Sequence, residues 1–176
     1  IIDAVAVIAN ENRYHPVCDF LNAYTGTERN AYASVCTAFS VLIQMITPMN
    51  IEVVSAGSYL RAFKPGCKFE VMLCLVSGQG AGKSSFFRLL AVNDDWFSDD
   101  LKKLDDENVY RKMQGHWIIE MSEMIATPTQ DIEEIKSFLS RQKETYKIPY
   151  ETHPADRKRQ CVFGGSSNTL DFLPLD

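Results

Sequence analysis

The hydrophobic and polar positions divide the chain into a helical first third and an alternating remainder. Amphipathic or apolar segments predict helices at residues 3–12, 16–24, 30–46 and 51–63. After the Lys64-Pro65-Gly66 break, short apolar runs alternate with helical patterns. This alternation predicts an α/β core with a mainly parallel sheet, residues 64–176, preceded by a small helical subdomain, residues 1–63.

Three apolar runs are the expected strands of the core. The first, 69–76, is short and almost continuously apolar, as is typical of a strand covered on both faces; 116–121 is a second buried strand, and 159–168 is the third short strand. Helical patterns follow them at 82–91, 106–115 and 127–142. The last pattern begins with helix-start residues, Thr127 as N-cap and Pro128 at the first helical position.

A segment of small residues separates the first expected strand from the next helix. It reads SGQGAGKS, residues 77–84, and follows the phosphate-loop pattern GxxxxGK[ST] except for Ser77 at the first position. Backbone N–H groups in such a turn bind phosphate at the positive end of a helix, and glycines leave room for its approach. We therefore expect ATP here, with Lys83 on the β- and γ-phosphates and the Ser84 hydroxyl on Mg²⁺. The expected nucleotide-binding residues are Gly78, Gln79, Gly80, Ala81, Gly82, Lys83, Ser84 and Ser85.

The ends of the other two strands supply acids and an amide. Mg²⁺ and a hydrolytic water need carboxylates at the tip of a neighbouring strand, and GHWIIEMSEM provides Glu120 and Glu123. One acid is expected to complete the Mg²⁺ shell through water, and Glu120 is taken for that role with Ser84. The other is expected to polarise the attacking water, although spacing alone leaves the two roles interchangeable. Asn168, at the end of the third strand, is expected beside the γ-phosphate.

Several stretches, in this order, resemble virulence-associated protein E. They are RAFKPGCKFEVMLCLVSGQGAGKSSFFRLLA, DWFSDD, GHWIIEMSEM, IKSFLSRQ, PYETH and RKRQCVFGGSSN. The resemblance covers most of residues 61–176, with a weaker match at YTGTER, residues 24–29. This phage- and pathogenicity-island-encoded family has P-loop ATPase domains resembling superfamily 3 helicases of the AAA+ class. The resemblance implies that Lys83 and Ser84 are the Walker A pair, that Glu120 and Glu123 are the Walker B acids, and that Asn168 is the motif C sensor.

The resemblance also implies a function in the full-length protein. That function is ATP-driven DNA unwinding or replication initiation by a ring, expected to be a hexamer, on single-stranded DNA. The family is usually rich in arginine between SFLSRQ and PY, but this chain has KETYKI there. Each remaining cation is individually typical of a solvated surface. The candidates for DNA contact are Arg141, Lys143, Lys147, Lys158 and Arg159.

The end of the chain sets a further expectation. The family continues into a segment whose arginines complete catalysis across a subunit boundary, whereas this chain stops at FLPLD. A trans-acting arginine is worth about 10³ to 10⁵ in turnover. We therefore expect this chain, a fragment without an initiating Met, to bind ATP·Mg²⁺, to hydrolyse it poorly, and to stay monomeric. Two other functions stay open: a P-loop switch that regulates a partner without translocation, and, ranked last, a small-molecule kinase.

Composition changes this picture little. An apolar fraction of 45% and a charged fraction of 23% are those of an ordinary globular protein, and no apolar run reaches the length of a membrane span. A net charge of −5 argues only mildly against nucleic-acid contacts. Five cysteines without a CxxC pair, together with three scattered histidines, favour reduced thiols in a cytoplasmic protein over a disulfide framework or a zinc site.

Overall fold

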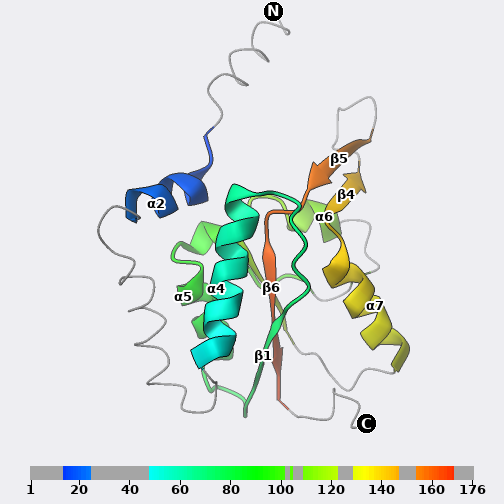
Figure 1. Cartoon of the computed structure of the whole chain (residues 1–176). Helices are drawn as coiled ribbons and strands as arrows, with labels where there is room; N and C mark the ends of the chain where they lie inside the picture. Colours follow the sequence, from blue (N-terminus) through cyan, green and yellow to red (C-terminus); the bar gives the residue numbers. More distant parts are fainter. Residues whose placement is uncertain are drawn as a thin grey trace, which may run out of the picture.

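A four-stranded parallel sheet forms the centre of the molecule (Figure 1). The structure, a computed structural model, describes residues 14–24, 48–101, 104, 109–122, 129–146 and 154–168. The strand order is β1-β6-β3-β2, and β6 pairs in parallel with both β1 and β3. The predicted α/β class with a mainly parallel sheet is therefore confirmed. The strands are β1 (Leu73–Val76), β2 (Phe97–Ser98), β3 (Ile118–Met121) and β6 (Val162–Ser167).

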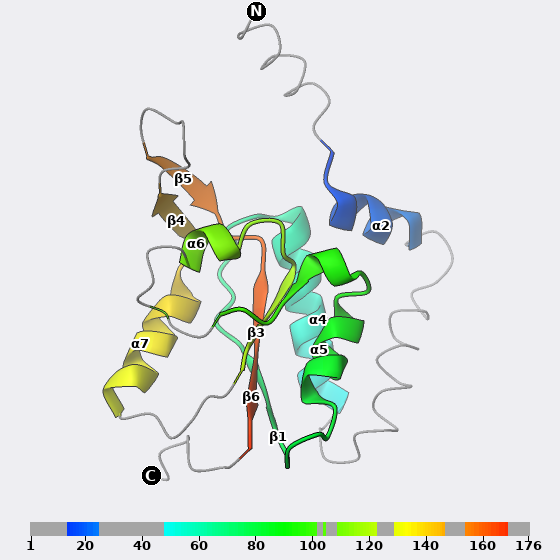
Figure 2. The ribbon, with the colours of Figure 1, turned by 180° about the vertical axis from the view of Figure 1, so that it is seen from behind.

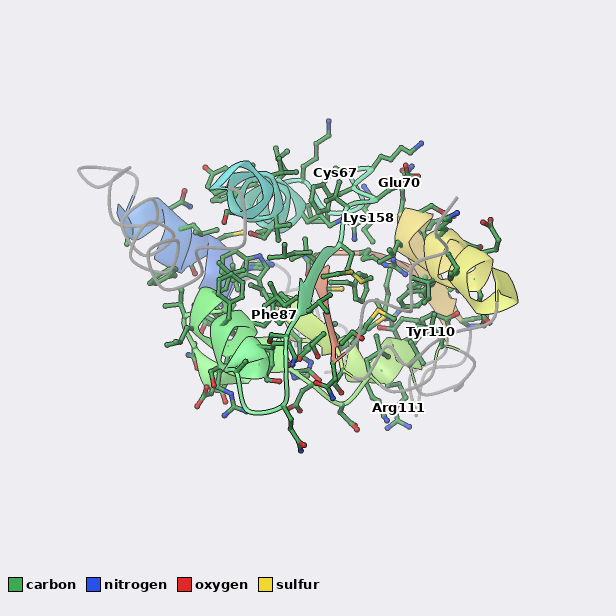
Figure 3. The ribbon with its side chains drawn as sticks, turned by 90° about the horizontal axis from the view of Figure 1, so that it is seen from below. Cys67, Glu70, Phe87, Tyr110, Arg111 and Lys158 are labelled. Carbon is green, nitrogen blue, oxygen red and sulfur yellow. The ribbon has the colours of Figure 1, made fainter. Side chains whose placement is uncertain are left out.

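Helices cover both faces of this sheet. Figure 3, which looks onto the ends of the strands, shows α4 (Pro48–Phe63) and α5 (Lys83–Leu90) on one side and α7 (Thr129–Ser140) on the other. Successive side chains of a strand point to opposite faces, so each strand contributes to two clusters. Ile118 of β3 packs in the cluster on the α4 and α5 side. Ile119, the next residue, packs on the α7 side, where the short α6 (Val109–Lys112) also contributes.

The observed strands are shorter than the apolar runs that predict them. β1 begins at Leu73, four residues later than expected, and Phe69 instead packs against α4. β3 begins at Ile118, two residues later than expected, and the preceding Trp117 is also buried: its indole N–H donates to the carbonyl oxygen of Ser58 in α4, at 3.0 Å. An apolar run in the sequence therefore indicates which residues are buried, and only some of these residues belong to a strand of the sheet.

Other predicted helices agree with the structure in the described ranges. α2 (Pro16–Tyr24) has the predicted bounds, and α4 begins three residues before the predicted 51. Of the pattern at 106–115, the described helical part is α6, and α7 ends two residues before the predicted 142. The helices predicted at 3–12 and 30–46, and the predicted start at Thr127 and Pro128, lie outside the described residues.

Four elements have no counterpart in the sequence-based prediction. Two are short, the 3₁₀ turn η1 (Asp94–Trp96) and the two-residue β2 that follows it. The other two, β4 (Lys143–Tyr146) and β5 (Ala155–Lys158), form an antiparallel hairpin between α7 and β6 in the chain. It projects from the end of the sheet at which β6 begins (Figure 1).

The described parts of the first 63 residues share their core with the sheet. One buried cluster contains Val17 and Leu21 of α2, Val54 and Ala62 of α4, and Leu73 of β1. The division at residue 63 stays a prediction. Arg61 of α4 is also buried, and its guanidinium donates to the carbonyl oxygens of Cys161 at 2.9 Å and Phe69 at 2.8 Å. These bonds tie α4 to the segment that leads into β6.

One glycine sets the distance between α5 and the sheet. A Cβ atom at Gly164 of β6 would lie only 2.2 Å from Cε1 of Phe87 in α5. Phe87 is fully buried, so its ring has little room to move away. Figure 2 shows the result from behind: α5 follows directly on the turn that ends β1 and runs back along the sheet. The absent side chain thus lets the middle of α5 pack closely on the middle of β6.

The described cysteines, Cys18, Cys67, Cys74 and Cys161, are free thiols. Burial raises the pKa of Cys74, and it raises the pKa of the fully buried Cys161 to about 11. A neutral buried thiol packs as a small hydrophobic group. None of the helices in the described ranges combines the length and hydrophobicity that a membrane crossing needs.

Candidate functional site

A glycine-rich loop, residues 77–82, connects β1 to α5 at the carboxyl edge of the sheet. Gly80 and Gly82 have φ angles of 79° and 81°, in the left-handed region that glycine adopts without strain. Gly82 is also the N-cap of α5 and offers its helix no side-chain acceptor. Within the described part of the chain, the first N–H groups of α5 thus have no side-chain cap, the condition in which a helix start binds an anion.

The loop opens on a pocket of about 380 Å³. The expected residues Gln79 to Ser85 all line it, whereas Gly78 lies in the loop outside the lining. The opposite wall comes from the ends of β3 and β6, namely Ser122, Ser166, Ser167 and Asn168. Ligands of open α/β sheets bind at this carboxyl edge, so the pocket lies where the topology favours a site.

The ammonium group of Lys83 lies over the loop. Its Nζ donates to the carbonyl oxygens of Ser77 at 2.6 Å and Gly78 at 3.0 Å, and to Oδ1 of Asn168 at 3.0 Å. These three acceptors match the three donors of an ammonium group. Lys83 and Asn168 stand 85 positions apart in the chain, and the fold brings the two predicted residues into direct contact.

A buried carboxylate joins the loop to the sheet. The Oγ atoms of Ser84 and Ser166 both donate to Oε1 of Glu120, at 2.9 and 2.6 Å. The expectation that the strand of Glu120 neighbours β1 is wrong, because β6 lies between β1 and β3. The contact forms across β6 because Glu120 is paired with Gly164, which places no side chain in the way.

The second oxygen of this carboxylate is the unusual feature of the site. Glu120 is fully buried, and its Oε2 has no hydrogen-bond partner among the described residues. A buried acceptor without a partner costs about 1–3 kcal/mol, more when it is charged, and a water ligand of a cation would remove that cost. Mg²⁺ prefers one or two carboxylates with water and phosphate oxygens, so Ser84 and Glu120 fit such an ion.

Ser166 is a site residue that the sequence analysis did not single out. It is 5% exposed in a strand whose six residues are all buried. The available signal was the polar pair Ser166-Ser167 within an otherwise small and apolar run. Glu123 and Lys147, which the sequence analysis did single out, lie outside the described residues.

Three of the candidate DNA-contacting cations are exposed on or beside the hairpin. They are Arg141, Lys143 and Lys158. Lys143 forms an ion pair with Asp156 across the hairpin, and this bond, with a second one from Thr145, holds the pKa of Asp156 below its usual range. The guanidinium of Arg141 donates to the hydroxyl of Tyr110 at 2.7 Å.

Arg159, the fourth described candidate, is buried. Its guanidinium forms an ion pair with the buried Glu144 and donates to the carbonyl oxygen of Phe138 at 2.6 Å. The group also lies over the rings of Phe138 and Phe163, at 4.6 and 5.1 Å from their centroids. These contacts anchor the hairpin to α7 and β6, and they leave Arg159 inaccessible to a strand of DNA at the surface.

Comparison with known proteins gives one family and one fold. The family model of the Virulence-associated protein E-like domain matches residues 14–176, and a search of curated proteins found no match. The apo A form of the NrS-1 C-terminal region has a similar fold, with a TM-score of 0.55 and 14% identity over 78% of this chain. A second structure of that region, covering residues 305–718, gives 0.51 and 12% over 77%. The matches cover 34% and 32% of those chains, so this chain spans about a third of their length.

Proposed function

The chain belongs to the Virulence-associated protein E-like domain family, and from this premise we propose that it is the ATP-binding P-loop core of a phage-type replication protein. The observation that carries the proposal is the 2.9 Å hydrogen bond from Ser84 Oγ to Glu120 Oε1. A loop hydroxyl that meets a carboxylate from a strand tip is the pairing that holds Mg²⁺ beside nucleotide phosphates in P-loop proteins. The parallel sheet also supports the proposal, because it brings the ends of β1, β3 and β6 to the same edge as the glycine-rich loop.

Each described residue of the site has a role in this proposal. The phosphates of ATP occupy the pocket over the glycine-rich loop, where Lys83 exchanges its three acceptors for β- and γ-phosphate oxygens. Ser84 and Glu120 hold Mg²⁺, which when bound neutralises the charge that develops on the phosphate oxygens. Asn168, already in contact with Lys83, orients the attacking water or responds to its product. The second acid is Glu123, on the family resemblance alone.

In the full-length protein we propose that this core is part of a ring, expected to have six subunits, that moves on single-stranded DNA. The exposed cations Arg141, Lys143 and Lys158 at the hairpin support a contact with a phosphate backbone. The same core without translocation would be a nucleotide-dependent switch. DNA dependence of ATP turnover separates these two functions.

Replacing Lys83 with alanine tests the proposed ATP site directly. We expect Lys83→Ala to weaken the binding of ATP·Mg²⁺ by tenfold or more, because hydrogen bonds to charged groups contribute about 1.5–3 kcal/mol each. The measurement is isothermal titration calorimetry on this chain. Lys68→Ala is the control, since Lys68 is equally cationic, exposed, and paired with Glu70 away from the loop. Equal affinities of Lys83→Ala and the unmodified chain would contradict the proposal.

A further inference from the structure

The outer surface of α4 carries no charge between residues 53 and 63. The inner face of the helix is buried, with Val54 and Ala62 in the core cluster on that side of the sheet. The exposed residues on the outside, called here the α4 surface, are Val53, Ala56, Tyr59, Leu60 and Phe63. A helix that is hydrophobic all round is typically covered on every side. The α4 surface is therefore a candidate for contact with another chain.

The end of the α4 surface is positive. The exposed Lys64 follows it directly. Arg61 is buried beneath it, and its guanidinium donates to carbonyl oxygens of the backbone, which carry no charge to offset its own. Lys68 and Glu70, a few positions further on, form an ion pair and neutralise each other. An acidic partner would therefore suit this end of α4.

A smaller apolar surface lies at the end of α5. Leu89 and Val92, called here the α5 surface, are 51% and 48% exposed, and the backbone N–H of Val92 donates to the carbonyl oxygen of Leu89 at 3.1 Å. Val92 follows the C-cap of α5 with a φ angle of 69°, a left-handed conformation that glycine usually supplies after a helix. A β-branched residue is strained there. The strain indicates that the exposed side chain of Val92 has a use that glycine would not serve.

The surroundings of the α5 surface are negative. Asp94, Asp95 and Asp99 are exposed. Arg88, which directly precedes Leu89 in α5, lies 3.9 Å from a carboxylate oxygen of Asp94 and 4.0 Å from one of Asp99. Three acids beside one arginine leave this end of α5 with a charge opposite to that at the end of α4.

We propose that the α4 surface of one copy of this chain binds the α5 surface of the next copy. Apolar side chains form the centre of the contact, and the opposite charges at its rim set the orientation. Because the two surfaces differ, the contact is head-to-tail, the kind from which rings are built. α4 is the nearer helix in Figure 1 and α5 the nearer in Figure 2, the view from behind, so the two helices turn their outer surfaces in different directions. The inference assigns a contact to the proposed ring, and in that respect it rests on the proposed function.

Cross-linking in the full-length protein tests the contact. One preparation carries Leu60→Cys and another carries Val92→Cys, and the two are mixed before ATP·Mg²⁺ and a short bis-maleimide are added. We expect severalfold more covalent dimer in the mixture than in either preparation alone, where a new cysteine meets only native ones. Tyr14→Cys in place of Val92→Cys is the control, because Tyr14 is exposed and belongs to neither surface. It should give no more than the background.

Replacing Val92 with glycine separates the contact from folding, because the two expected effects have opposite signs. Val92→Gly relieves the left-handed φ angle, so the midpoint of thermal unfolding of this chain should rise by about 2–4 °C. The same change removes a side chain from the α5 surface. The dissociation constant of the full-length assembly, measured by sedimentation, should therefore rise severalfold. A purely structural role for Val92 would not weaken assembly while stabilising the fold.

Charge reversal tests the orientation of the contact. We expect Asp95→Lys and Lys64→Glu each to weaken assembly of the full-length protein severalfold at low salt, because each places like charges at the rim. The two changes combined in one chain should restore assembly, since opposite charges then meet again. Lys136→Glu is the matched control, because Lys136 is an exposed lysine on α7 that pairs with Glu133. It should assemble as the unmodified protein does.

The inference is overturned if the link between positions 60 and 92 does not exceed the background, or if the combined reversal assembles no better than the single ones. When the protein still sediments as an oligomer in that case, its copies meet through other surfaces and the proposed function stands. A full-length protein that stays monomeric overturns the ring together with this inference, and it leaves the ATP site to be judged by Lys83→Ala.

Discussion

At the scale of single residues, two hydroxyl groups from different elements hold one carboxylate oxygen. Ser84 belongs to α5 and Ser166 to β6, and both donate to Oε1 of Glu120. Two donors on one oxygen fix the rotation of the carboxylate about its last bond, and so fix where Oε2 lies. If Glu120 serves Mg²⁺, Ser166 is a positioning residue that acts through Glu120 rather than on the phosphates.

Removing the Ser166 hydroxyl should therefore alter the Mg²⁺ requirement. We expect Ser166→Ala to raise the Mg²⁺ concentration that half-saturates ATP binding by about threefold to tenfold, which corresponds to about 0.7–1.4 kcal/mol, the net contribution of one ordinary hydrogen bond. ATP affinity at saturating Mg²⁺ should change little. The measurement is a Mg²⁺ titration at fixed ATP.

Ser58→Ala controls for the loss of a buried hydroxyl as such. Ser58 is fully buried in α4, its Oγ donates to the carbonyl oxygen of Ser55 at 2.8 Å, and it does not line the pocket at the loop. This variant should keep the Mg²⁺ requirement of the unmodified chain. An unchanged requirement in Ser166→Ala would remove Ser166 from the site.

The site residues differ in how far sequence could predict them. Lys83 and Ser84 follow from local spacing, since the GxxxxGK[ST] pattern fixes their chemistry wherever it folds. The role of Ser166 depends on the register that pairs Glu120 with Gly164, and no local pattern encodes a register between strands more than forty positions apart. Arg159 stands in a run of basic residues typical of a surface, and only its tertiary partner Glu144 explains its burial.

At the scale of elements, the hairpin β4–β5 shows how a strand can escape prediction from the alternation of apolar and polar residues. Along β4 only Glu144 is fully buried, so the strand lacks the apolar positions by which strands are predicted. The inward-facing residue of β4, Glu144, instead forms an ion pair with Arg159. The hairpin has a second ion pair, Lys143 with Asp156, on its exposed side. One element thus carries a buried pair and a surface pair.

These two pairs should differ sharply in their effect on stability. We expect Glu144→Ala to lower the free energy of unfolding by about 3–5 kcal/mol, because it leaves the Arg159 guanidinium buried without its acid. Asp156→Ala, in the facing strand, should have little effect because solvent screens its pair with Lys143. Urea denaturation of both variants gives the comparison. Similar losses in the two variants would show that Arg159 and Glu144 do not anchor the hairpin.

At the scale of the whole molecule, alternating segments were enough to predict an α/β class, but not the order of the strands. The chemistry of a Mg²⁺ site, which needs a carboxylate at the tip of a neighbouring strand, predicts the strand of Glu120 beside β1. The last strand, β6, instead lies between β1 and β3. Its glycines explain how a late strand fits there, since Gly164 lets α5 pack closely over it. A glycine is needed at position 164 because α5, which is distant in the sequence, packs there, so no local pattern predicts it.

The proposed motor and the alternative switch differ in their response to DNA. For the full-length protein we expect single-stranded DNA to raise ATP turnover severalfold, and Lys83→Ala to abolish turnover with or without DNA. The measurement is steady-state phosphate release at several salt concentrations, because contacts with a phosphate backbone weaken as salt rises. A rate that DNA leaves unchanged, with Lys83 still essential, would favour the switch.

Strand β6 has a consequence for communication across the molecule. Its last residues meet the glycine-rich loop, and Arg159, three residues before its start, anchors the hairpin. Six residues of strand span about 20 Å. Both edges of β6 are hydrogen-bonded to neighbouring strands, and all its residues are buried. The strand therefore resists bending, and a small shift along its axis displaces both of its ends together. A displacement of Asn168 would therefore be transmitted along the backbone of β6 to Arg159, and from there to the hairpin through the ion pair with Glu144.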